Sequence, residues 1–174
     1  VNASMYDRAT TLYEALMTAV RLSSSKQPVC ILSEGLYPGD IQVVETMASH
    51  TDLKIVRLPL VRGRSDAAAL GQLLAEYPET VAVAFAQTTH FGCLEDVDLL
   101  TDTIQRSPAL AVAVVDPLLL GPGGLKAPAN FGDRGADMFV AEGQHLALAP
   151  NFGGPGLGIF GIRFNKDVKT HIRS

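Results

Sequence analysis

The sequence predicts an α/β protein, in which helices cover both faces of a mostly parallel, doubly wound β-sheet with one antiparallel strand. Helical and strand patterns alternate from the start of the chain, and the strand-like runs are apolar throughout. Alternation of this kind is typical of βαβ units. Continuous apolar runs are typical of strands buried on both faces, so these two observations together predict a three-layer architecture.

The first predicted helix begins near the N-terminus, where Asp7 or Ser4 can cap it. Its apolar positions fall on one face, and they are Ala9, Leu12, Tyr13, Leu16 and Val20. Residues 29–32 are wholly apolar and predict a buried strand. Pro38 suits the first turn of a second helix, whose predicted inward residues are Ile41, Val44 and Met47.

The middle of the chain continues the alternation. Residues 54–58, 80–86 and 110–115 predict three further strands, the last ending at Asp116. Between the first two, Asp66 can cap a helix. Its predicted inward residues are Leu70, Leu73, Leu74 and Tyr77. A fourth helix is predicted to begin at Glu95, with Val97, Leu100 and Ile104 inward.

The last third of the chain has few helical patterns. Residues 117–135 are rich in glycine and proline and predict a long ordered loop. Two closing strands are predicted at residues 137–141 and 157–163. Parallel neighbours are usually joined through a helix, and the segment between these strands lacks one. We therefore expect the last strand to be antiparallel.

The composition restricts the class of protein. The 174 residues are 47% hydrophobic with a formal net charge of −4, which excludes intrinsic disorder and predicts one domain over residues 1–174. The acidic balance disfavours nucleic acid and anionic membranes as partners, and no apolar run approaches the roughly 20 residues of a membrane span. The N-terminal residues show no signal-peptide pattern. The chain begins at Val1 and lacks an initiator methionine, so we expect a fragment of a longer chain.

The cysteine content predicts a reducing environment. Cys30 and Cys93 are too few for a disulfide scaffold, and neither has a neighbour at metal-binding spacing. We therefore expect a cytoplasmic protein.

Ligands of doubly wound sheets bind outside the carboxyl ends of the strands, which directs attention to residues 33–37, 87–93, 116–120 and 142–151. Asp116 follows a very hydrophobic strand, where a carboxylate needs a partner or a cation. A hydrogen bond to loop backbone and a contact with the protonated ring nitrogen of a cofactor both remain open. Residues 142–145, Glu-Gly-Gln-His, suit either an active site or an exposed capped turn.

Other patterns favour structural interpretations. Residues 156–161 match G-x-G-x-x-G, but they run into strand-like residues instead of opening a helix, which favours a packed turn over a nucleotide site. His90 and Cys93 have no further zinc ligands at matching spacing, so no metal site is predicted. A Cys93–His90 nucleophile pair lacks a third group to orient it.

An ordered set of motifs resembles one enzyme family. The motifs are Asn2-Ala3-Ser4-Met5-Tyr6-Asp7, Phe91-Gly92 with Glu95-Asp96, Val114-Val115-Asp116-Pro117, Glu142-Gly143-Gln144 and Phe152-Gly153-Gly154-Pro155. Colinear over nearly the whole chain, this set resembles glycine dehydrogenase (decarboxylating), the P-protein of the glycine cleavage system. The Glu-Gly-Gln form is similar to subunit 1 of the two-subunit enzyme.

The resemblance implies the fold of the large domain of aspartate aminotransferase-type, pyridoxal-phosphate-dependent transferases. It implies that the holoenzyme, an oxidoreductase acting on CH–NH2 donors, decarboxylates glycine and passes the aminomethyl group to the lipoyl arm of H-protein. In this family the Schiff-base lysine belongs to subunit 2. We therefore expect the chain to pair with subunit 2, to bind no pyridoxal phosphate alone and to be inactive alone.

The resemblance also identifies candidate cleft residues. In lysine-bearing relatives, the lysine lies roughly nine residues before the Gly-Gly-Pro turn, and counting back from Gly153 reaches Gln144, whose amide cannot form a Schiff base. No catalytic or cofactor-binding residue is therefore expected in this chain. The residues expected to line the cleft are Ser4, Tyr6, Asp7, Asp116, Gln144 and His145.

Three alternatives remain open. A transaminase or desulfurase of the same fold could use Lys126 as its Schiff-base lysine. A pure interaction module would bind subunit 2 through the same fold and keep a vestigial cleft. A nucleotide-binding domain would depend on the glycine motif at residues 156–161.

Overall fold

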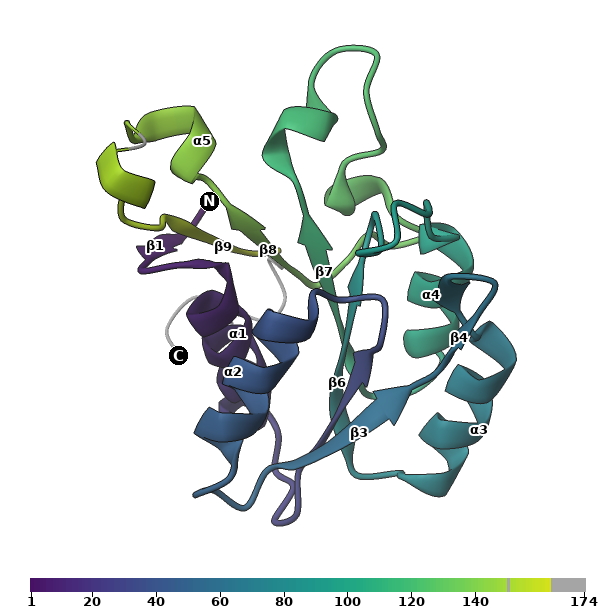
Figure 1. The fold of residues 1–174 in the computed structure, drawn as a ribbon. Helices are drawn as coiled ribbons and strands as arrows, with labels where there is room; N and C mark the ends of the chain where they lie inside the picture. The colour runs from purple at the N-terminus through teal and green to yellow at the C-terminus, as the bar shows by residue number, and fades with distance from the viewer. Residues whose placement is uncertain (150, 164–174) are drawn as a thin grey trace.

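A computed structural model describes residues 1–149 and 151–163 of the chain (Figure 1). Its main sheet has seven strands in the order β1-β9-β8-β7-β6-β2-β3. Their bounds are Ala3–Met5 (β1), Val29–Ser33 (β2), Lys54–Leu58 (β3), Thr80–Ala86 (β6), Leu110–Val115 (β7), Met138–Glu142 (β8) and Gly158–Ile162 (β9). Strands β3, β2, β6, β7 and β8 pair in parallel, whereas β9 is antiparallel to both β8 and β1. The predicted reversed strand is therefore confirmed as β9.

Four helices form the two outer layers (Figure 1). Helices α1 (Arg8–Leu22) and α2 (Pro38–Ala48) lie on one face of the sheet, and α3 (Ala67–Glu76) and α4 (Val97–Ile104) lie on the other. A short helix, α5 (Gln144–Ala147), follows β8, and a small hairpin pairs β4 (Leu60–Val61) with β5 (Arg64–Ser65). No helix among the described residues is both long enough and apolar enough to cross a membrane.

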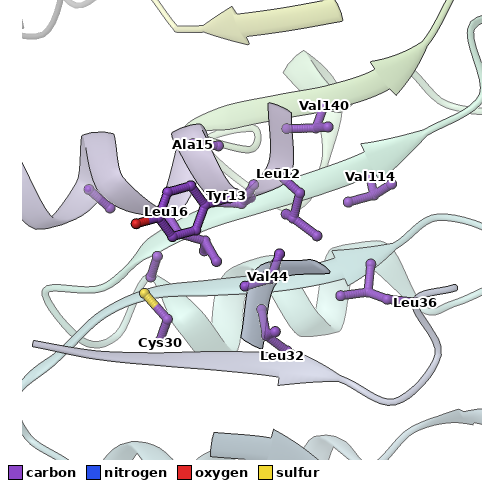
Figure 2. Packing of buried hydrophobic residues seen from close by; sticks show 14 of the residues in the cluster. Leu12, Tyr13, Ala15, Leu16, Cys30, Leu32, Leu36, Val44, Val114 and Val140 are labelled. Atoms are coloured by element: carbon purple, nitrogen blue, oxygen red, sulfur yellow. The ribbon is translucent and has the colours of Figure 1, made fainter. Parts of the chain in front are cut away.

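Helix α1 shows why the predicted pattern forms a helix at this place. The Asp7 side chain accepts a hydrogen bond from the Thr10 N–H at 2.8 Å and caps the helix, so Asp7 rather than Ser4 is the cap. Figure 2 shows Leu12 and Leu16 of this helix beside Val44 of α2. Both leucines are fully buried, and each such burial stabilises the fold by about 1.5–3 kcal/mol.

The sheet divides the core into two clusters. Cys30 and Leu32 of β2 point to the α1 and α2 side, whereas Ile31 between them packs on the α3 and α4 side. All five residues of β2 and all seven of β6 are buried. The apolar runs that predicted strands covered on both faces therefore have the expected environment.

Several predicted details are wrong, for local reasons. Met47 is 37% exposed rather than inward, because α2 buries only one narrow stripe against the sheet. Glu95 does not begin a helix: α4 starts at Val97, and Asp96 caps it through the Leu99 N–H. Tyr77 was predicted as an inward residue of this helix, but it follows the last helical residue of α3 as its C-terminal cap. Strand β1 and the β4–β5 hairpin were not predicted, since two or three residues are too few to show a period.

Candidate functional site

The candidate site is a cavity of about 250 Å³ at the carboxyl edge of the main sheet. It lies among the start of α1, the segment between β2 and α2, and the ends of β7 and β8. Its polar lining is Arg8, Tyr37, Thr88, Asp116, Glu142 and His145. Its apolar lining is Leu36, Ala86, Val114, Val115 and Leu119. The fold thus joins segments distant in sequence at the edge where ligands of such sheets bind.

Arg8 contributes a guanidinium group to the lining of this cavity, and two neighbouring side chains hold that group in position. Its Nε donates a hydrogen bond of 2.6 Å to Oδ2 of Asp40, in the first turn of α2. Its guanidinium carbon lies 4.4 Å from the centre of the Tyr37 ring, which adds a cation–π contact. The Arg8 and Asp40 side chains are 25% and 12% exposed, so the pair is largely shielded from water. This pair could not be predicted from the sequence, because its members are 32 residues apart.

The Glu142 side chain forms hydrogen bonds to three backbone segments around the cavity. Its carboxylate accepts hydrogen bonds from the N–H groups of Gln144 at 2.9 Å, Leu157 at 2.8 Å and Arg8 at 3.2 Å. The last of these donors lies at the N-terminus of α1, where the helix dipole favours a negative charge. Glu142 therefore joins the end of β8, the approach to β9 and the start of α1.

Asp116 and His145 lie next to each other in the lining of the cavity. Asp116 Oδ1 accepts a hydrogen bond of 2.9 Å from the Leu118 N–H and lies 3.3 Å from Nε2 of His145. Of the two interpretations left open by the sequence, the hydrogen bond to loop backbone is observed. Since both side chains are more than a third exposed, they remain accessible to a ligand.

The other four predicted cleft residues do not line this cavity. Ser4 lies exposed in β1 opposite Ile159, Tyr6 is 84% exposed, and Asp7 caps α1. Gln144 begins α5, and its Nε2 donates a hydrogen bond of 2.6 Å to the Gly153 carbonyl. That bond ties α5 to the glycine-rich turn. A role for these four residues in a cleft stays a prediction.

Lys126 points away from the cavity. Its Nζ lies 2.8 and 2.7 Å from the two carboxylate oxygens of Asp98 in α4. The hydrogen bond from Lys126 lowers the pKa of Asp98, and a further bond from the Gly132 N–H acts in the same direction. The Lys126 ammonium is thus engaged with α4, and the residue is absent from the cavity lining.

Glu95 is a buried carboxylate whose position the sequence did not reveal. Both of its oxygens accept the Ser65 N–H at 3.0 Å, and Oε1 also accepts the Ser65 hydroxyl at 2.6 Å. The Ser65 hydroxyl lies 2.6 Å from that of Ser33, at the end of β2. Burial raises the pKa of Glu95, although the hydrogen bonds from Ser65 act to lower it. This chain of groups secures the β4–β5 hairpin to the carboxyl edge of the sheet.

The residues around His90 do not assemble a second site. His90 Nδ1 lies 3.4 Å from the Gly35 carbonyl oxygen, and its ring packs on Phe91. No hydrogen bond joins His90 to Cys93 in the described part of the chain. Within residues 1–149 and 151–163, no three His, Cys, Asp or Glu side chains are grouped so that they could hold a metal ion.

The glycine motif at residues 156–161 has a packing role. Gly158 and Gly161 lie within β9, so the motif continues into a strand and opens no helix there. A Cβ at Gly158 would overlap Thr11 Oγ1 and the Asp7 carbonyl, and one at Gly161 would overlap the Phe139 ring. The glycines therefore let β9 approach α1 and its own sheet neighbour closely.

Comparison with known proteins gives a consistent result. The family model described as glycine cleavage system P-protein matches residues 1–172. A probable glycine dehydrogenase (decarboxylating) subunit 1 of Legionella pneumophila (strain Corby) is 35% identical over 175 residues, covering 99% of this chain and 36% of the relative. The protein of the same name in Chlorobium chlorochromatii (strain CaD3) is 39% identical over 163 residues, covering 93% of this chain and 35% of the relative.

Solved structures agree with these relatives. Glycine decarboxylase (P-protein) of the glycine cleavage system, solved in inhibitor-bound form, matches with a TM-score of 0.79 and 33% identity over 99% of this chain and 35% of that chain. Pyridoxamine-pyruvate aminotransferase from Mesorhizobium loti matches with a TM-score of 0.58 and 18% identity over 98% of this chain and 40% of that chain, which shows a shared fold. The chain spans about a third of the length of the curated relatives.

Proposed function

Because this chain belongs to the glycine cleavage system P-protein family, we propose that it is part of the glycine decarboxylase subunit that lacks the Schiff-base lysine. The assembled enzyme decarboxylates glycine and transfers the remaining aminomethyl group to the lipoyl arm of H-protein. This chain pairs with the lysine-bearing subunit 2 and forms one wall of the cleft between them.

The observation that carries this proposal is the cavity lining itself. Pyridoxal phosphate is held by a Schiff base with a lysine amine and supplies the electron sink for decarboxylation. Among the described residues, no lysine lines the cavity, and Lys126 is paired with Asp98. The residues present therefore do not fit a covalently held pyridoxal phosphate, and we derive no reaction step through it in this chain.

An exposed apolar rim supports pairing with another subunit. Four large hydrophobic residues near the carboxyl edge each expose more than half of their surface to solvent. They are Tyr6, Leu118, Leu146 and Phe152. In Figure 1 the elements that carry the last three, namely the turn after β7, α5 and the turn that follows it, rise beyond the strand ends. Large apolar side chains that are exposed at one edge of a sheet suit a surface that a partner covers.

The cysteines support a cytoplasmic location for the assembled enzyme. Both are free, and burial raises the pKa of the Cys30 thiol to about 12. Such a thiol stays protonated and unreactive, as is typical of a structural cysteine in a reducing compartment.

Reconstitution tests the proposal. The full-length protein that contains this sequence should lack glycine decarboxylation alone and gain it when mixed with a lysine-bearing subunit 2 and H-protein. Asp116→Ala and His145→Ala should lower the rate of the mixture by about tenfold or more if these residues orient the substrate. His50→Ala, an exposed change beyond α2, is the matched control and should leave the rate unchanged.

Two results would favour the alternatives. A borohydride-reducible absorbance band in the isolated protein, lost in Lys126→Ala, would indicate an independent pyridoxal phosphate enzyme. Binding to subunit 2 with unchanged turnover in both cleft variants would indicate a pure interaction module.

A further inference from the structure

A second hollow lies at the turn of the β4–β5 hairpin, apart from the carboxyl-edge cavity. Its volume is about 560 Å³, and it shares no lining residue with that cavity. The residues that line it are Glu34, Leu60, Arg62, Gly63, His90 and Phe91. The described part of the chain places no metal-binding cluster there, so this surface can hold a partner through apolar contact and charge.

The apolar part of this surface is exposed. Phe91 has 65% of its surface in solvent, and Val61, which follows the lining residue Leu60, has 55%. The Phe91 ring packs on the ring of His90, with the ring centres 3.9 Å apart, and the His90 N–H donates a hydrogen bond of 2.9 Å to the Gly35 carbonyl. Aromatic side chains are enriched where proteins bind one another. Phe91 is thus held in place while its ring stays available to a partner.

Two arginines of the hairpin have no acidic partner. Arg62 lines the hollow, and Arg64 lies opposite Val61 in the hairpin. Four other arginines form ion pairs within the described part of the chain, but no carboxylate there pairs with Arg62 or Arg64. Glu34 is the one carboxylate among the lining residues. Both guanidinium groups are therefore available to an acidic partner, whose carboxylates match their fork geometry.

The backbone at Arg62 indicates that the turn itself does not explain the arginine. The two residues of the turn, Arg62 and Gly63, have φ angles of 53° and 78°. Turns of this type require positive φ at both positions and therefore favour asparagine, aspartate or glycine at the first. Arginine adopts this conformation at an energetic cost, and such strain is concentrated at functional sites.

The hairpin is fixed on the sheet before any partner binds. Ser65 donates hydrogen bonds from its N–H and its hydroxyl to the buried Glu95 carboxylate. The Thr89 hydroxyl donates a hydrogen bond of 3.1 Å to the Gly63 carbonyl, within the turn. Because the turn is already ordered, binding costs little further conformational entropy.

We propose that this hairpin surface docks an acidic segment of a partner protein, with an apolar side chain in the hollow beside Phe91 and carboxylates on Arg62 and Arg64. A nucleic acid would offer phosphates but no apolar side chain for the hollow, and the net charge of −4 opposes its approach. The proposal goes beyond the function above, because this surface lies outside the carboxyl-edge cavity and takes no part in glycine chemistry.

Fluorescence anisotropy with the full-length protein tests the chemistry of the partner. The probe is a labelled peptide of alternating glutamate and leucine, and two matched peptides replace either glutamate by lysine or leucine by alanine. The glutamate–leucine peptide should bind, and each matched peptide should bind at least about tenfold more weakly. Raising sodium chloride from about 50 to 500 mM should weaken the binding, since exposed ion pairs are screened.

Arg62→Asn tests the location of the site without endangering the fold. Asparagine suits the turn better than arginine, so the thermal transition should stay unchanged or rise. The affinity for the glutamate–leucine peptide should nevertheless fall by about fivefold or more. Phe91→Ser, also an exposed change, should remove most of the advantage of leucine over alanine in the peptide.

Arg106→Asn is the matched control, because Arg106 is likewise exposed, forms no ion pair among the described residues and lines no part of this hollow. It should bind the peptide as the wild type does. The proposal is overturned if the folded wild type binds no peptide, if the lysine peptide binds as tightly, or if Arg62→Asn keeps the wild-type affinity. It also fails if single-stranded DNA or phosphatidylserine vesicles displace the peptide at equal charge concentration, which would indicate a general anion surface.

Discussion

The two edges of the main sheet differ in what their cavities contain. The cavity at the amino edge has a volume of about 900 Å³ and is lined by the loops before β2, β6 and β7. Its charged residues, Lys26 and Glu79, are exposed, and the Glu79 carboxylate accepts a bond from the Ser25 hydroxyl. The cavity at the carboxyl edge is less than a third of that volume, yet it gathers Arg8, Asp116 and Glu142.

This difference shows that a candidate site is marked by charged side chains from several segments that meet in one place, and not by the volume of a cavity. Parallel strands have their strand-to-helix loops at the carboxyl edge, where the N-terminus of α1 also lies, and their helix-to-strand loops at the amino edge. Charged side chains at the carboxyl edge contact backbone N–H groups at the start of α1 and contact one another, in a region that is partly shielded from water. The amino edge receives helix C-termini and open loops, so its charges remain solvated.

The largest effect is expected where α1 meets β9 beside the carboxyl-edge cavity. Gly158→Ala places a Cβ against Thr11 Oγ1 and the Asp7 backbone, which cannot move without shifting the α1 cap. Denaturant unfolding of the full-length protein should show a loss of about 3 kcal/mol. Gly71→Ala in α3, where nothing lies within 4 Å of the new methyl group, should instead be neutral or stabilising by up to about 1 kcal/mol. Equal effects of the two changes would contradict the close contact.

A smaller effect is expected from the shielded ion pair, and it compares the two edges directly. Asp40→Ala leaves the Arg8 guanidinium uncompensated, and the free energy of unfolding should fall by about 2 kcal/mol. Glu79→Ala at the amino edge removes an exposed carboxylate and should change it by less than about 0.5 kcal/mol. If both changes cost the same, the carboxyl edge is no more shielded than the amino edge.

The smallest effect concerns pH and Glu95. Because burial raises the pKa of Glu95 above the ordinary 4.5, folding favours its protonated form. The protonated Glu95 contributes its whole stabilisation at pH values below its pKa in the unfolded chain. That stabilisation is lost as the pH rises through its pKa in the folded protein. Arg64 and Asp96 are the charged groups that face Glu95, and their effects on its pKa oppose each other.

Glu95→Gln cannot titrate, so the difference in unfolding free energy between wild type and variant should fall as the pH rises from about 4 to 7. A flat profile for Glu95→Gln would show that the carboxylate is not buried in solution.

Much of the fold was predictable because its determinants are local. Strands β3, β6 and β7 have the predicted bounds, since each is a continuous apolar or half-apolar run that the sequence itself delimits. The caps Asp7 and Asp66 were predictable for the same reason, because an N-cap contacts N–H groups two or three residues ahead. Strand β1 was not predictable, since its partner among the described strands, β9, lies more than 150 residues away.

The candidate site was predictable only in its location. Asp116 and His145 were expected at the carboxyl edge, and the structure places both in the cavity lining. Arg8, Asp40 and Glu95 were missed, since each looks like an ordinary charged residue near a helix end. Only contacts across 30 residues or more distinguish them.

By itself, the sequence determined the layer architecture, the reversed strand and the family. These features depend on residue periods, glycine and proline placement and motif order, which short-range sterics and apolar burial convert into structure. Only the tertiary structure decided which charges meet. Electrostatic partners are chosen by distance in space, and that distance is fixed once helices and strands pack, so the Arg8–Asp40 pair and the shielded Glu95 carboxylate belong to the fold and not to any segment of the chain.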